Sequence, residues 1–341
     1  MFDQNVQRVG FACKYHHPDQ TLKPKLLEQQ QRPFNGLSTS IAWLNRQAGN
    51  DAEERLLEIA RFNIKCFYNL ITYAATLGDK RQMVRLSSDV LPAYTHPNFR
   101  QLYQRQDVID ELSGKLADVG SLARTLDVRI SMHPGQFVVL ASDRPDVVEN
   151  SIEEFEYHAT VARWMGYGQE FQDMKINVHI SGRQGPEGIK KVLPRLSTEA
   201  RNTLTIENEE MAWGLDSTLE LAQHVPLVLD IHHHWVREGE YIKPNDDRVK
   251  QVIDSWRGVR PTCHYSVSRQ DYLKDHDDSL PNMNELLTQG YKKAKLRAHS
   301  DRMWNHAVNL WAAEFNNQFD IMIEAKHKNE ASKDFVEDYI N

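Results

Sequence analysis

The sequence predicts an α/β protein built as a single closed (β/α)8 barrel. Eight short apolar runs have the length of buried parallel strands, and helix-length segments separate them along 341 residues. The alternative, an open doubly wound sheet, usually carries a glycine-rich phosphate loop after its first strand. Here CKYHHPD follows the first run, which favours the barrel. The predicted strands span residues 8–12, 83–87, 128–133, 175–180, 203–207, 226–232, 262–267 and 319–324.

The segments between the strands are expected to be helical. Apolar residues repeat on one helical face in 104–126 and again in 145–165. Residues 38–77 are expected to hold one or two helices, with Ser38 or Thr39 as the N-cap. The other expected elements are helices at 186–196, 216–224 and 245–257, a longer helical region at 282–317, and a terminal helix or tail at about 330–341, in one domain spanning 1–341.

Composition places the chain among ordinary globular proteins. Apolar residues make up 40% and charged residues 26%, which excludes a disordered, collagen-like or coiled-coil chain. No stretch approaches the roughly 18 consecutive apolar residues of a membrane helix, and no secretory signal opens the sequence. We therefore expect a cytoplasmic protein, of a bacterial or phage-like cytosol, without a membrane partner. The cysteines at 13, 66 and 263 are far apart, which fits a reducing compartment rather than a zinc ribbon or disulfide framework.

The net charge of −7 argues against a protein that coats nucleic acid without specificity. It leaves room for a DNA enzyme, because a local basic rim is sufficient for binding phosphates. The chain also contains 15 histidines, and histidine is the commonest metal ligand.

Metal-ligand residue types gather at one end of the predicted strands. In a closed α/β barrel the carboxyl ends of all strands meet at one face, and six of the eight predicted strands bring a His, Asp or Glu there. Imidazoles mixed with carboxylates suit Mn²⁺, Zn²⁺ or Fe²⁺, whereas Mg²⁺ favours oxygen ligands alone. The candidate metal ligands are His96, His133, His179, Glu207, Asp230, His233, His264, His299 and Glu324, enough for two or three divalent ions. The histidines at 16, 17, 232, 234, 276 and 327 are interpreted as spectators.

These motifs resemble those of the UV damage endonuclease family of DNA repair enzymes. They are RLSSD, HPGQF, NVHISG, IENEE, LVLDIHHHW, HYS, AHSDR and DIMIEAK, from one end of the chain to the other. The resemblance implies a TIM barrel related to endonuclease IV, a cluster of divalent metals with Mn²⁺ the first expectation, and the same nine ligands. It also implies a hydrolase that nicks damaged double-stranded DNA immediately 5′ to a photolesion or similar distortion. A monomer without an organic cofactor is expected, with Glu207, Glu324 and His264 in catalytic roles.

Two residues of the family that probe the damaged duplex match Gln136 and Phe137. An apolar wedge inserted between bases costs least where a lesion has already weakened stacking. Backbone contacts are expected from a basic stretch around His299. Its members are Lys292, Lys293, Lys295, Arg297 and Arg302, with Arg100, Arg105 and Lys326 as further candidates.

The chain departs from the family pattern at two positions. Phe11 stands where an aromatic hydroxyl is common, after the glycine of the first strand. Thr262 stands where the family usually has a lysine, two residues before His264. Residues two apart on a strand point to the same side, so Thr262 is expected to face the barrel mouth. There its short hydroxyl would leave a gap for water and hold one metal more loosely.

Three other functions use similar residues. A metal-dependent sugar isomerase on a related barrel would have a closed pocket and no exposed wedge at 136–137. An iron-dependent peptide-modifying oxidase on a similar barrel would consume oxygen. A degenerate barrel that binds damaged DNA without cutting is disfavoured, because the ligand set is complete.

Overall fold

A computed structural model describes residues 2–340, and it confirms the predicted barrel. Eight parallel strands pair in sequence order, and β8 returns to β1 through register pairs such as Val9↔Ile321. Every strand lies inside its predicted range, shorter by one to three residues. The strands are β1 Val9–Ala12, β2 Met83–Leu86, β3 Arg129–Met132, β4 Lys175–His179, β5 Leu204–Glu207, β6 Leu227–Asp230, β7 Thr262–Tyr265 and β8 Asp320–Ile323.

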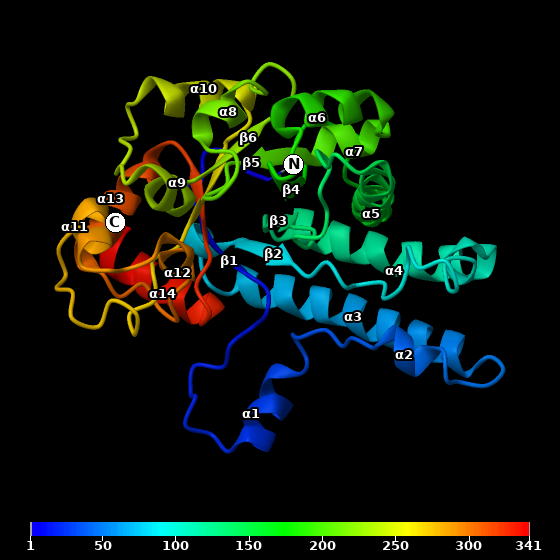
Figure 1. The fold of residues 1–341 in the computed structure, drawn as a ribbon. Helices are drawn as coiled ribbons and strands as arrows, with labels where there is room; N and C mark the ends of the chain where they lie inside the picture. Colours follow the sequence, from blue (N-terminus) through cyan, green and yellow to red (C-terminus); the bar gives the residue numbers. More distant parts are fainter. Residues whose placement is uncertain (1, 341) are drawn as a thin grey trace.

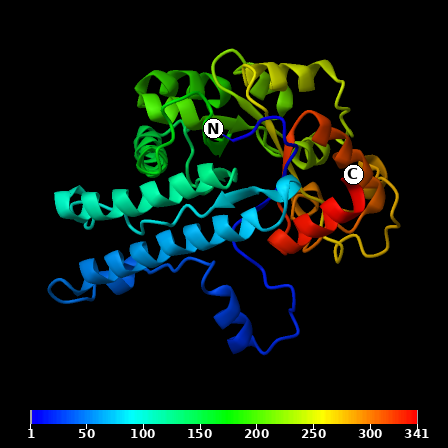
Figure 2. The ribbon, with the colours of Figure 1, turned by 180° about the vertical axis from the view of Figure 1, so that it is seen from behind.

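Helices surround the barrel, and the long pair α3 and α4 runs side by side in both views (Figures 1 and 2). Helix α1 buries no residue and lies apart from the barrel. Among residues 2–340, no helix is both long and apolar enough to cross a membrane. The α-helices are α1 Pro24–Gln31, α2 Ile41–Leu44, α3 Asp51–Ala75, α4 Gln106–Thr125, α5 Pro145–Trp164, α6 Gly185–Val192, α7 Thr198–Thr203, α8 Leu215–Leu219, α9 Ile231–Glu238, α10 Asp247–Ser255, α11 Met283–Thr288, α12 Lys293–Leu296, α13 His306–Ala313 and α14 Lys328–Tyr339.

Some predicted boundaries are wrong for local reasons. The N-cap in region 38–77 is Ser40, whose side chain accepts from Trp43 N; neither Ser38 nor Thr39 has that role. The sixth strand was predicted to continue to 232, but helix α9 begins at Ile231 because the Asp230 carboxylate caps it. Helices α1, α7 and α9 were not expected. The predicted terminal segment 330–341 falls within α14 as far as Tyr339, and Asn341 lies outside the described residues.

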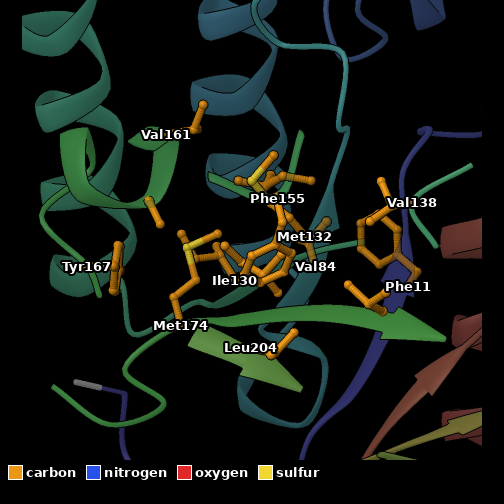
Figure 3. Close-up of a cluster of buried hydrophobic side chains, with 14 of the residues drawn as sticks. Phe11, Val84, Ile130, Met132, Val138, Phe155, Val161, Tyr167, Met174 and Leu204 are labelled. Atoms are coloured by element: carbon orange, nitrogen blue, oxygen red, sulfur yellow. The ribbon is translucent and has the colours of Figure 1, made fainter. Parts of the chain in front are cut away.

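The apolar core lies between the strands and the helix layer. Ile130 and Met132 of β3 pack in a buried cluster that includes Phe155 of α5 (Figure 3). Because side chains alternate along a strand, the neighbouring residues of β3 point into the barrel instead. Apolar side chains thus hold the strands to the helices, and the barrel interior is left to the other face of each strand.

The barrel interior is unusually polar. Residues Lys175, Asn177 and His179 share the inner face of β4, and Thr205 and Glu207 share that of β5. Thr205 Oγ1 donates to Asn177 Oδ1 at 2.8 Å, and the Asn177 amide donates to the Glu207 carboxylate. Branched apolar residues usually fill this space. Here a column of polar side chains leads up to the carboxyl ends of the strands.

Ion pairs close the opposite end of the barrel. The buried Asp320 carboxylate accepts from Arg129 at 2.6 Å and from Arg260 at 2.7 Å, and it also accepts from the backbone amide of Arg8. Arg129 lies against the ring of Phe2, 4.2 Å from its centroid. With that end sealed, the carboxyl ends of the strands form the accessible mouth.

Candidate metal centre

Glu207 stands at the centre of the barrel mouth. It is the last residue of β5 and is fully buried. Its Oε2 lies 3.3 Å from His133 Nε2, and its Oε1 lies 3.1 Å from His264 Nδ1. Strand register places His179 directly beside it on β4. One carboxylate therefore faces imidazoles from three different strands.

Asp230 and His233 form a second part of the cluster. Asp230 ends β6 beside His264 of β7, and its Oδ1 accepts from His233 N at 2.7 Å. This cap turns the chain into α9 and brings His233 back over the mouth, with Nδ1 at 3.6 Å from Glu207 Oε1. Asp230 Oδ2 is buried and has no hydrogen-bond partner among residues 2–340. Such an oxygen is costly to bury unless a cation or a proton compensates it.

Glu324 follows β8 and joins the cluster from the other side. Its Oε1 lies 3.4 Å from His264 Nδ1, and its Oε2 lies 4.0 Å from His299 Nδ1. Arg85 of β2 forms an ion pair with the same carboxylate. Burial acts to raise the pKa of Glu324, but Arg85 and His264 outweigh it and hold the pKa well below its usual range. The carboxylate is therefore ionised at neutral pH.

Three overlapping groups of side chains could hold a metal ion. In each group one potential ligand atom per residue lies within 4.8 Å of the others. Because Glu207 belongs to two of these groups and His264 also belongs to two, ions bound in them would be close neighbours. The groups are His133–Glu207–His264, His179–Glu207–His233 and Asp230–His264–Glu324.

The protonation of the imidazoles fits cation binding. Burial lowers the pKa of His179 and of His264 to about 4, so both rings are neutral and carry a free lone pair at pH 7. Burial acts to lower the pKa of His233 as well, but the carboxylates of Asp230 and Glu207 outweigh it and raise the pKa to about 9. A cation in this group would take the place of that proton.

His96 is the predicted ligand that the structure leaves apart. It lies in the loop after β2, half-buried, where its Nδ1 accepts from Asn98 N at 3.2 Å and its ring packs on Phe99. Neither His96 nor His299 belongs to any of the three groups among the described residues. The ligand role of each stays a prediction.

The sequence reasoning missed Lys175 and Glu210. The Nζ of Lys175, on β4, lies 2.9 Å from His264 Nε2 inside the barrel, and burial lowers the pKa of this lysine to about 7. The strand pattern of KINVHI could have placed Lys175 on the face of His179. Glu210 Oε2 lies 3.6 Å from His233 Nε2, and its Oε1 accepts from Arg297 at 2.9 Å.

Thr262 and Phe11, the two departures, are both fully buried. Thr262 shares the inner face of β7 with His264, and its Oγ1 has no hydrogen-bond partner among the described residues. An amine nevertheless reaches His264, from Lys175 of β4 rather than from β7. Phe11 packs in the core, with its ring 6.2 Å from that of Tyr73.

The predicted wedge lies exposed at the mouth. Gln136 is exposed and the Phe137 side chain is 71% exposed, so the phenyl ring is not part of the core. Gly135 makes room for that ring, since a Cβ there would come within 2.5 Å of Phe137 Cε1. The ring is thus held against its own loop with one face open to solvent.

The predicted basic residues differ in exposure and in whether their charged groups already have partners within the protein. Lys292, Lys295 and Arg297 are exposed, although Arg297 is tied to Glu210. Lys293 Nζ donates to the Arg237 carbonyl at 2.6 Å, and Arg302 pairs with Asp334 of α14. The further candidates also have partners: Arg100 with Glu153, Arg105 with Asp107, and Lys326 with Asp301.

Comparisons with known proteins identify related chains. A family model described as UV-endonuclease UvdE matches residues 23–339. A UV DNA damage endonuclease of Bacillus thuringiensis subsp. konkukian (strain 97-27) is 24% identical over 310 residues, which cover 88% of this chain and 87% of the relative. A UV-damage endonuclease of Schizosaccharomyces pombe is 26% identical over 337 residues; these cover 95% of this chain but 49% of that longer relative.

Two solved structures support the barrel. The crystal structure of SacUVDE matches with a TM-score of 0.71 and 24% identity, covering 97% of each chain. Endonuclease IV from Thermus thermophilus matches with a TM-score of 0.51 and 12% identity, covering 80% of this chain and 91% of the other.

The closed barrel and its clustered imidazoles and carboxylates define a TIM-barrel protein whose mouth could hold metal ions. The chain belongs to the UV-endonuclease UvdE family, whose model covers nearly all of it. The resemblance drawn from the motifs is confirmed.

Proposed function

We propose that this protein is a metal-dependent DNA repair endonuclease that hydrolyses one phosphodiester of damaged double-stranded DNA, immediately 5′ to a UV photolesion or similar distortion. Family membership supports this activity. The observation that carries it is the shared position of Glu207, whose Oε2 lies 3.3 Å from His133 of one group and whose Oε1 lies 3.6 Å from His233 of another. Adjacent cation sites of this kind suit in-line cleavage of a phosphate ester.

The three groups around Glu207 and His264 would hold two or three divalent ions, with His96 and His299 as outer candidates. Mn²⁺ is the expected metal, and Zn²⁺, Fe²⁺ or Mg²⁺ are the alternatives. When bound, such ions supply Lewis acidity to the phosphate and to the attacking water.

The side chains of this cluster are in protonation states that suit cation binding. His179 and His264 are neutral and present lone pairs, while Arg85 keeps Glu324 ionised. Glu207, Glu324 and His264 are the proposed catalytic residues, and the two carboxylates can accept a proton from the attacking water. Water adds to phosphorus and gives up a proton, the bond to the 3′-oxygen breaks, that oxygen takes up a proton, and a 3′-hydroxyl and a 5′-phosphate remain.

The surface around the mouth would recognise the duplex. Phe137, exposed beside Gln136, would enter the stack where a lesion has weakened it. Lys292, Lys295 and Arg297 would contact the backbone, since their charges are presented at the surface. An exposed aromatic ring at the mouth argues against a sugar isomerase with a closed pocket.

A nicking assay tests this proposal directly. A duplex with one photoproduct and an end label is incubated with the protein, with and without Mn²⁺, beside an undamaged duplex. We expect a single nick 5′ to the photoproduct that requires the metal. His179→Ala and Glu324→Gln are expected to abolish nicking but retain DNA binding, because neither belongs to the wedge.

His224→Ala is the matched control, because His224 is exposed and lies outside the three groups. Equal loss of binding and nicking in both site variants would contradict the division between cluster and wedge. No metal-dependent nick by the wild-type protein on any photoproduct duplex would refute the proposed activity. Oxygen consumption with Fe²⁺, or conversion of a ketose to an aldose, would instead support one of the other barrel enzymes.

A further inference from the structure

Met211 is an exposed apolar side chain beside the candidate metal centre that the proposed activity does not yet use. It lies in the loop between β5 and α8 and is 54% exposed. Its position parallels that of Phe137, because Met211 lies four residues beyond Glu207 and Phe137 lies four residues beyond His133. Both loops therefore carry an exposed apolar side chain shortly after a candidate ligand at a strand end.

The backbone at Met211 is fixed by its neighbours. The Met211 carbonyl accepts from Arg237 at 2.8 Å, and Glu209 closes the loop by accepting from Ala212 N at 3.0 Å through its carboxylate. Glu209 N also donates to the carbonyl of Trp213 at 2.9 Å. These bonds order the backbone of the loop before DNA binds, so binding need not pay for ordering it.

The same loop is joined to the loop that carries Phe137. Trp213 Nε1 donates to the Gly182 carbonyl at 2.7 Å, which links the β5 loop to the β4 loop. Gln184 N donates to the Ala141 carbonyl at 2.9 Å, which links the β4 loop to the segment after Phe137. The three loops form one connected rim, so Phe137 and Met211 keep a fixed relation to each other.

On its other side Met211 adjoins the basic stretch. Arg297 pairs with Glu210 at 2.9 Å, and Lys293 donates to the carbonyl of Arg237, the residue that holds Met211. Glu210 in turn lies 3.6 Å from His233 of the metal cluster. Glu210, the residue before Met211, therefore lies between a cation suited to phosphates and a side chain of the metal cluster.

We propose that Met211 is a second apolar probe, which contacts the bases of a damaged duplex beside Phe137 and contributes to recognition of the lesion. The inference rests on the proposed endonuclease function. Methionine is among the apolar residues that proteins insert between base steps, and its flexible thioether adapts to irregular gaps such as those at a lesion.

The test compares Met211→Ala and Met211→Leu with Leu310→Ala, a control in which an equally exposed apolar residue of α13 is truncated. Dissociation constants are measured for a photoproduct duplex and for its intact counterpart over a range of salt concentrations. A fluorescent base analogue opposite the lesion reports unstacking. Circular dichroism melting of each variant checks that the fold is unchanged.

We expect Met211→Ala to lower the preference for the damaged duplex, measured as the ratio of the two dissociation constants, about tenfold. A loss of this size corresponds to a few methylene-sized groups that are no longer buried against the bases. Met211→Leu should restore most of that preference, and the fluorescence signal should fall only in the alanine variant. The slope of log Kd against log salt should stay unchanged in Met211→Ala, because methionine neutralises no phosphate, whereas Arg297→Ala should reduce it.

The inference is overturned if Met211→Ala prefers the damaged duplex as strongly as Leu310→Ala does. It is also overturned if Met211→Ala binds the damaged and the intact duplex more weakly by the same factor. Wild-type nicking of the same duplex is measured alongside. If the wild-type protein nicks and Met211→Ala keeps its preference, only the role of Met211 fails. If the wild-type protein does not nick, the proposed function fails.

Discussion

Replacing Lys175 with methionine should stabilise the metal-free protein and impair its proposed activity. Lys175 is 2% exposed, and the one polar contact of its Nζ described in residues 2–340 is His264 Nε2 at 2.9 Å. Burial lowers the pKa of this lysine from its ordinary value of 10.5 to about 7. The folded state therefore disfavours the charged amine, and methionine fills a similar volume without that cost.

The size and sign of the effect follow from this pKa. Because one pKa unit corresponds to about 1.4 kcal/mol, burying Lys175 costs about 4 kcal/mol near pH 7 and about 2 kcal/mol near pH 9. The unfolded chain binds the extra proton throughout this window, so the wild-type protein gains stability as the pH rises from about 7 towards 10.5. Below pH 7 both states are protonated and the cost is constant.

Urea unfolding of the chelated wild-type and Lys175→Met proteins, near pH 7 and near pH 9, measures this cost. The advantage of the variant should shrink by about 2 kcal/mol over that interval. Lys80→Met, at an exposed lysine, serves as the control and should change little. Nicking by Lys175→Met should slow, because His264 loses its partner at Nε2. Equal stability of both proteins at the two pH values would refute the reasoning.

Three further predictions concern the mouth. Elemental analysis after reconstitution should find two or three divalent ions per chain, and less than one would contradict the shared cluster. Gln136→Ala combined with Phe137→Ala should weaken binding of a damaged duplex by roughly 1–3 kcal/mol, the scale of stacking on one base; unchanged preference over intact duplex would count against the wedge. Thr262→Lys should lower the Mn²⁺ concentration for half-maximal nicking, and more so in a Lys175→Thr background, because Lys175 already brings one amine to His264. Identical metal titrations in all these proteins would show that position 262 does not influence the metals.

The sequence by itself determined the number and order of the strands. Eight apolar runs marked the strands, because a strand that packs against helices must be apolar on its outer face. This requirement does not depend on which other strands or loops are its neighbours. Closure of the barrel places all carboxyl ends at one face, so His133, His179, Glu207, Asp230 and His264 could be assigned to one mouth before any contact was known.

Tertiary structure decided which of these side chains meet. Strand register pairs His179 with Glu207 and Asp230 with His264. The sequence of a single strand does not show how that strand is aligned with its neighbour. The same holds for His96, whose loop turns it towards Asn98 and Phe99 rather than into the three groups. A ligand in a long loop cannot be placed from its distance along the chain.

Tertiary structure also decided which charged or polar side chains lie beside the residues of the candidate metal centre. Arg85 pairs with Glu324 across 239 positions of sequence, and Lys175 meets His264 across the barrel at a separation of 89. Alternation along β4 places Lys175 on the inner face, but only the closed barrel sets the diameter that lets its four-carbon chain span to β7. The sequence therefore supplied the residues of the centre, while the closed geometry chose their partners, because Coulomb and hydrogen-bond energies depend on distances through space.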